Sequence, residues 1–204
     1  LIDATTGNHV WAQRYDRELA DFFDLQDEIS ETIAGAIEPE LGAFERERAR
    51  SRPPENLGAW EHAQRGFGHL WQFDKGENAQ ARRMFQGAIG LDPGLGPAHA
   101  GLAYSYLLDA SLAFTESPAD ALDAAAGAAQ EAIALDDRDA LAHTALGRAL
   151  VHLGDMEAGV AQLETAIELN PSFALAHYGL GQAYLYLVRA EESAAAIDTA
   201  IRLS

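Results

Sequence analysis

The sequence ALAHTALGRALVHLGDMEAGVAQLETAIELNPSF, residues 140–173, recurs without a gap as ALAHYGLGQAYLYLVRAEESAAAIDTAIRLS, residues 174–204, at a spacing of 34 residues. Eight positions of the first copy carry the same or a similar residue in the second, namely His143, Leu146, Gly147, Leu150, Leu163, Ala166, Ile167 and Leu169. A fixed period of this length is typical of repeat proteins, in which each unit buries its apolar face against the next unit. The sequence therefore predicts an array of stacked repeats.

Each copy contains two helical patterns. Apolar residues recur at intervals of three and four, the period of one helical face, and the pattern breaks near Gly154 and near Val188. Small residues, such as Gly147 and Ala166, stand where packed helices must approach each other closely. Pro171 follows the second helical pattern, where its missing N–H costs least. Each unit is thus predicted to be a helical hairpin.

Two earlier units carry the same pattern with insertions. Residues 57–95 contain Gly66, Ala81, Phe85, Ala88 and the closing sequence LDP, and residues 96–139 contain about ten extra residues near 109–120. The insertion is either a long hairpin loop or an extended first helix. Ser117, Pro118 and Asp120 are an N-cap residue, a first-turn proline and a first-turn acid, so the second helix of this unit is expected to begin there.

This pattern of small residues and closing Asn-Pro or Asp-Pro resembles the tetratricopeptide repeat (TPR) family. The resemblance implies a mainly α fold in which four TPR-like hairpins, over residues 57–204, form a right-handed superhelix. It also implies a scaffold that binds other proteins.

Residues 1–56 differ from the repeats. Apolar and polar residues alternate around Thr6-Gly7-Asn8, which predicts a β-hairpin over residues 1–20, and a helical stripe from Asp21 predicts a connecting helix and linker over residues 21–56. Followed by helical repeats, this stretch resembles the C-terminal remnant of a TolB-like α/β domain in bacterial TolB-like/TPR proteins. Such proteins resemble class III adenylate or guanylate cyclases or winged-helix regulators. We expect residues before Leu1, further repeats after Ser204, and the effector domain elsewhere in the parent chain.

Composition limits the partners. The 204 residues carry 32 acids against 14 bases, a formal charge of −18, which disfavours nucleic acid and anionic membranes. This acidity is either a solvated surface or a means of recruiting a basic partner. Cysteine is absent and no run of 18 apolar residues occurs, so no membrane span is predicted and the cytoplasm is the expected location.

The first helix of each unit should line a groove. Counting along these helices predicts that a partner-binding groove is formed by Tyr104, Leu108, Thr144, Arg148, His152, Tyr178, Gln182 and Tyr186. Tyrosine and arginine often anchor interfaces because they combine contact area with directional hydrogen bonds. The alternative is that these side chains pack between helices. Arg148 is the one cation among them, which departs from the Lys and Asn cluster of carboxylate-clamp TPRs and disfavours an acidic C-terminal peptide.

No enzymatic site is predicted. Motifs of the GxSxG, HExxH, P-loop and dinucleotide-binding types are absent, so no catalytic residue, cofactor or metal is expected. Four histidines share one repeat position, His62, His99, His143 and His177, but repeats stack roughly 10 Å apart, too far for neighbouring imidazoles to share an ion. Three functions stay open: a binding module for a protein or peptide, an oligomerisation module that yields a homo-oligomer, and the C-terminal region of a class III nucleotide cyclase.

Overall fold

The computed structural model describes residues 58–204, and the hairpin predicted at residues 1–20 and the helix predicted at residues 21–56 lie outside them. The described part is helical, and its eight helices are α2 (Ala59–Leu70), α3 (Lys75–Leu91), α4 (Gly96–Ser111), α5 (Pro118–Leu135), α6 (Ala140–Leu153), α7 (Met156–Leu169), α8 (Ala174–Tyr186) and α9 (Ala190–Leu203). None of these helices is both long and apolar enough to cross a membrane.

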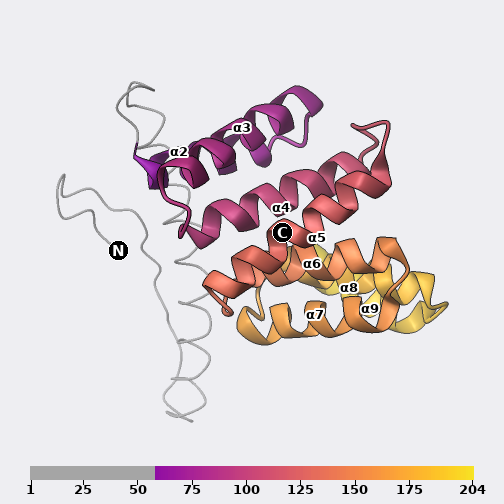
Figure 1. The fold of residues 1–204 in the computed structure, drawn as a ribbon. Helices are drawn as coiled ribbons and strands as arrows, with labels where there is room; N and C mark the ends of the chain where they lie inside the picture. The colour runs from indigo at the N-terminus through magenta and orange to yellow at the C-terminus, as the bar shows by residue number, and fades with distance from the viewer. Residues whose placement is uncertain (1–57) are drawn as a thin grey trace, which may run out of the picture.

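Consecutive helices pair as four hairpins, α2 with α3, α4 with α5, α6 with α7 and α8 with α9. The first helices of the units also contact one another in order, α2 with α4, α4 with α6 and α6 with α8. Figure 1 shows the hairpins following one another from the purple α2 and α3 to the yellow α8 and α9. The mainly α repeat fold expected from the 34-residue period is therefore confirmed in this part of the chain.

The unit with the insertion, residues 96–139, has both an extended first helix and a long hairpin loop, the two alternatives that the sequence left open. Its first helix, α4, extends to Ser111, and residues 112–117 then form the loop that leads to α5. The second helix begins at Pro118, as expected, but the Ser117 side chain makes no capping hydrogen bond. Instead, the backbone N–H of Ser117 donates to Thr115 Oγ1 at 3.2 Å. The insertion therefore lengthens the hairpin without changing its place in the stack.

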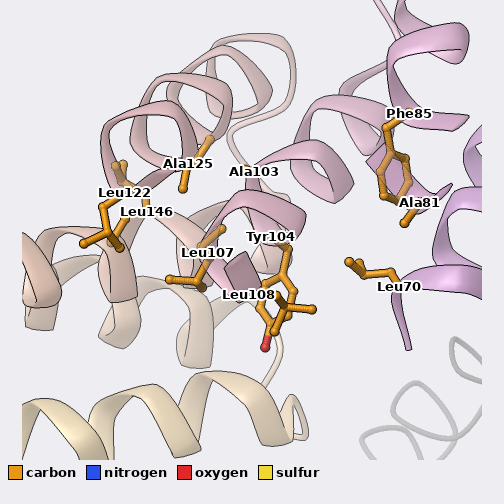
Figure 2. Packing of buried hydrophobic residues seen from close by; sticks show 13 residues of the cluster. Leu70, Ala81, Phe85, Ala103, Tyr104, Leu107, Leu108, Leu122, Ala125 and Leu146 are labelled. Carbon is orange, nitrogen blue, oxygen red and sulfur yellow. The ribbon is translucent and has the colours of Figure 1, made fainter. Parts of the chain in front are cut away.

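The largest core cluster lies between α2, α3, α4, α5 and α6, and ten of its residues are labelled in Figure 2. Phe85 of α3 is fully buried, with its ring between Gly66 of α2 and Gly101 of α4. A Cβ atom at Gly66 would lie 2.6 Å from this ring, and one at Gly101 would lie 2.4 Å from it. Two glycines on neighbouring units thus make the room that one aromatic side chain needs to join three helices.

Each hairpin turns at a residue with positive φ. These residues are Phe73 (φ 51°), Ala113 (φ 54°), Gly154 (φ 97°) and Val188 (φ 59°). A left-handed backbone ends a helix and redirects the chain, but it strains every residue except glycine by about 1–2 kcal/mol. Three of the four turns therefore hold a side chain in a conformation that glycine would adopt more easily.

Candidate functional site

The eight predicted groove residues lie on the first helices α4, α6 and α8, which contact one another in that order. The eight side chains differ in solvent exposure. Four are buried, namely Tyr104, Leu108, Thr144 and Arg148; two are half-buried, His152 and Gln182; and two are exposed, Tyr178 and Tyr186. Leu108 belongs to the core cluster (Figure 2), and Thr144 donates its hydroxyl hydrogen to the Ala140 carbonyl at 2.7 Å. These two residues therefore support the helices and do not form a surface.

Four of the other residues form one chain of contacts across three units, centred on Arg148. Its Nη1 donates to the Tyr104 phenol oxygen at 2.9 Å. Its Cζ lies 5.8 Å from the Tyr104 ring centroid and 5.2 Å from that of Tyr178. Gln182 Nε2 then donates to the Tyr178 phenol at 3.1 Å. The guanidinium on α6 thus links the buried tyrosine of α4 to the exposed tyrosine of α8.

The aliphatic stem of Arg148 rests on a glycine. A Cβ atom at Gly179, on α8, would lie 2.8 Å from Arg148 Cγ and 3.0 Å from its Cδ. Sequence analysis did not single out Gly179, although it directly follows Tyr178. The absence of a side chain at this position lets α8 approach α6 closely enough for the stacking contact between Arg148 and Tyr178.

A second aromatic contact joins the same two helices further along, four residues after Arg148 on α6 and eight residues after Tyr178 on α8. The His152 and Tyr186 rings meet edge to face, with their centroids 6.0 Å apart. Burial lowers the pKa of His152 from its ordinary value of 6.5, and the positive charge of Arg148 lowers it further. Burial also raises the pKa of Tyr104 above 10.0, against the opposing effect of Arg148. His152 is thus favoured as a neutral ring beside a permanent cation.

The exposed part of this surface is aromatic and belongs to α8. Tyr178 is 41% exposed and Tyr186 is 52% exposed, while Tyr104 below them is 1% exposed and contacts Trp71, with ring centroids 5.5 Å apart. Sequence counting could place Tyr104 on the same helical face as the others. It could not reveal that Trp71, from the preceding unit, covers its ring.

The repeated histidines form hydrogen bonds that stabilise the turns between units. His99, His143 and His177 each donate a ring N–H, from Nε2, to the carbonyl oxygen six residues earlier, at 3.0, 3.0 and 2.9 Å. His62 differs, because its Nδ1 lies 3.2 Å from the Gly58 carbonyl oxygen. Within residues 58–204 no three His, Asp or Glu side chains gather as a metal-binding group. These bonds give the repeated histidine a structural role.

A buried polar cluster between α3 and α4 was not predicted. Asp109 is 7% exposed, and its carboxylate accepts from Asn78 Nδ2 at 2.7 Å and pairs with Arg82 at 2.6 Å. The guanidinium of Arg82 also lies over the Tyr106 ring, 4.9 Å from its centroid. An acid in the apolar sequence YLLDAS was the available signal. Because its members bind one another, this cluster joins two helices, although Asn78 Oδ1 is buried without a hydrogen-bond donor.

A hollow of about 490 Å³ lies between α2 and α3, and none of the predicted groove residues lines it. It is lined by Arg65, Gly68, His69, Gln72, Asp74 and Glu77. His69 Nδ1 and Glu77 Oε2 are 2.6 Å apart, and the Asp74 carboxylate accepts two backbone N–H bonds at the start of α3. These polar side chains are therefore engaged with the protein itself.

Known proteins support the repeat assignment. Residues 147–187 match a family model described as TPR repeat. A thermophilic TPR protein of Thermus thermophilus superposes with a TM-score of 0.64 at 19% identity, over 87% of this chain and 91% of that one. The structure of pilF from Pseudomonas aeruginosa gives a TM-score of 0.53 at 22% identity, over 78% of this chain and 63% of that one. The chain thus contains TPR repeat sequence and folds as a TPR-type helical array.

One curated relative is longer than this chain. It is a protein of Rhizobium meliloti (strain 1021) named "Putative adenylate cyclase 3", and it is 39% identical over 150 residues. The match covers 74% of this chain and 26% of the relative. The chain therefore spans about a quarter of that protein's length.

Proposed function

We propose that the described repeats form a scaffold that captures a protein partner through one of its peptide segments, and that the peptide lies along α4, α6 and α8. The observation that carries this proposal is the pair of exposed tyrosines on α8, Tyr178 and Tyr186, each held in place by a side chain of α6. Tyrosine side chains offer a large contact area with only about two rotatable side-chain bonds, so they lose little conformational entropy on binding and make effective anchors. A TPR-type array, which stacks its first helices side by side, supports the same use.

Random peptides displayed on phage test this proposal. Peptides selected on the 204-residue chain are expected to lose at least about tenfold in affinity for the Tyr178→Ala and Tyr186→Ala variants, because truncating a hot-spot residue typically costs about 2 kcal/mol or more. Ile201→Ala is the matched control, since Ile201 is an exposed apolar residue on the second helix α9. Selected peptides that bind both tyrosine variants as tightly as the unchanged chain would refute the groove.

A second proposal concerns the intact protein. The 39% identity to part of a cyclase-named protein supports a parent chain in which these repeats position or regulate a nucleotide cyclase domain. Catalysis would then lie outside the described repeats, whose fold belongs to a type normally used for binding. Since the substrate of such an enzyme is intracellular ATP, a cytoplasmic location fits this proposal.

The intact gene product tests the second proposal. Conversion of ATP to cyclic AMP and pyrophosphate is measured with the intact protein and with a version that lacks residues 58–204. We expect cyclase activity in the intact protein and a changed rate without the repeats. An intact protein without cyclase activity would contradict the proposal, and equal rates in the two versions would contradict a regulatory role for the repeats.

A further inference from the structure

Arg148 is a buried cation that has no anionic partner among residues 58–204. Its side chain belongs to a residue that is 5% exposed, and no carboxylate of the described residues pairs with it. Among the residues that the structure describes, its guanidinium makes a single hydrogen bond, from Nη1 to Tyr104, and its Nε is buried without an acceptor. Arginine is rarely buried unless it is paired, because removing a charge from water is costly.

The surroundings of Arg148 compensate this charge only in part. The rings of Tyr104 and Tyr178 face the guanidinium and attract it through their π electrons, a contribution weaker than that of a carboxylate. Burial first, and then the positive charge of Arg148, lower the pKa of His152, which lies one turn further along α6. A local positive potential thus persists in a chain whose formal charge is −18.

One side of the Arg148 guanidinium is covered by the ring of Tyr178. The ring of Tyr178 is the exposed layer stacked on the guanidinium, and its phenol is held by the hydrogen bond from Gln182. Gln182 Oε1 is itself buried without a donor. A turn of the Tyr178 side chain therefore breaks one side-chain hydrogen bond and leaves two adjoining side chains, Arg148 and Gln182, with polar atoms free for a ligand.

We propose that Arg148 binds the side-chain carboxylate of one aspartate or glutamate in the captured peptide, with Tyr178 turning aside to admit it. The proposal rests on the proposed peptide groove and assigns the chemistry that the groove recognises. A carboxylate matches the planar guanidinium and can accept from Nε and a terminal nitrogen together. A single arginine suits one negative charge, whereas a phosphate carries up to two and generally requires a basic cluster. The acidity of the remaining chain disfavours peptides that carry additional acids.

A double-mutant cycle tests this pairing. The peptide library is fused to the phage through its C-terminus, so that side chains supply every peptide carboxylate. Selected peptides are expected to share one acidic position, and replacing that Asp by Asn, or Glu by Gln, should weaken binding at least tenfold. Arg148→Gln should weaken binding by a similar factor, and the two changes together should cost no more than either alone. Arg148→Lys, which keeps the charge but loses the planar donor pair, should recover only part of the affinity.

The unchanged chain gives an independent reading should Arg148→Gln fail to fold. In nitrogen-15 NMR spectra, the Nε–H signal of Arg148 should move on addition of an acidic selected peptide and stay in place with its amide counterpart. An Nε–H signal that responds equally to both peptides would overturn the pairing, as would an amide replacement that weakens binding equally with and without Arg148.

The outcomes also separate this proposal from the groove itself. Peptides that require Tyr178 and Tyr186 but no acid would leave the groove standing and refute the role of Arg148. Failure to select any peptide whose binding depends on these tyrosines would count against both.

Discussion

Arg148 on α6 donates a hydrogen bond of 2.9 Å to the phenol of Tyr104 on α4, which lies 44 residues earlier in the chain. Both groups are buried, so the bond is made away from competing water and is stronger than an exposed one. This bond holds the Arg148 guanidinium against Tyr104 of the second unit, and the ring of Tyr178, from the fourth unit, stacks on the same guanidinium. The electrostatics of the groove therefore depend on side chains from three units.

The first prediction concerns His152, whose pKa is lowered by burial first and by Arg148 second. Between the folded-state pKa and 6.5, the unfolded chain binds more protons than the folded chain, so stability should fall as the pH drops through 6.5 and be retained above it. Arg148→Gln removes one of the two causes. The pKa of His152 should therefore rise in that variant, as followed by NMR titration of its ring protons. An unchanged pKa would show that burial alone sets the titration.

The second prediction concerns the close approach of α6 and α7 at Gly147. A Cβ atom there would lie 2.7 Å from Leu163 Cγ and 2.8 Å from the Gly159 carbonyl oxygen. Gly147→Ala should destabilise the protein by about 1–3 kcal/mol, because the backbone of α7 must move. Gly127→Ala on α5 is the control: nothing lies within 4 Å of the added atom, so better helix propensity should stabilise by about 0.5–1 kcal/mol. Urea denaturation measures both, and equal effects would contradict the packing argument.

The third prediction concerns the left-handed turns. Gly154→Ala should destabilise the protein by about 1 kcal/mol, because alanine is strained at φ 97°. Val188→Gly should have the opposite effect, since Val188 is 88% exposed, has φ 59° and loses little burial on truncation. Val188→Ala separates the loss of the side chain from the relief of the backbone. Thermal unfolding of the three variants checks the prediction, and a less stable Val188→Gly would show that the valine makes stabilising contacts.

The fourth prediction concerns Asp109, which joins α4 to Arg82 and Asn78 of α3. Asp109→Ala should cost about 3 kcal/mol, the lower end for breaking a buried pair, because Arg82 keeps some access to water. Glu192→Gln provides the comparison, since it breaks an exposed pair with Arg189 and should change stability little. The free energies of unfolding of the two variants, measured with denaturant, should therefore differ clearly. Similar losses of stability would argue against a structural role for the buried cluster.

The sequence correctly predicted the helical hairpins, their turns and the start of one helix. The matching of His143 with His177 at a spacing of 34 predicted the helical hairpins, and the breaks near Gly154 and Val188 are turns in the structure. The start of α5 at Pro118 was also predicted correctly. These features depend on local backbone preferences and on a period, and both can be read from one chain.

Features that depend on contacts between units could not be predicted in the same way. Helical counting placed Tyr104 and Tyr178 on first helices. It could not predict that Tyr104 is 1% exposed and Tyr178 41% exposed, because exposure depends on which side chains of neighbouring units cover each ring. The pairing of Asp109 with Arg82 was likewise invisible, because the two residues lie on different helices and no periodic pattern relates them. Ser117 is the N-cap residue of α5, as predicted, but the sequence did not reveal that its side chain makes no capping hydrogen bond.

Units of the array are joined by two kinds of contact, one between residues close in sequence and one between residues far apart in sequence. The two kinds have different consequences for how such an array evolves. A bond such as that from His177 to the Pro171 carbonyl joins residues six apart, so duplication or loss of a whole unit by recombination would carry or remove it intact. Arg148, in contrast, contacts Tyr104 in the preceding unit and Tyr178 in the following one. An extra unit inserted on either side would separate it from one of them. Descendants that keep this arrangement can therefore gain units outside the three, but not between them.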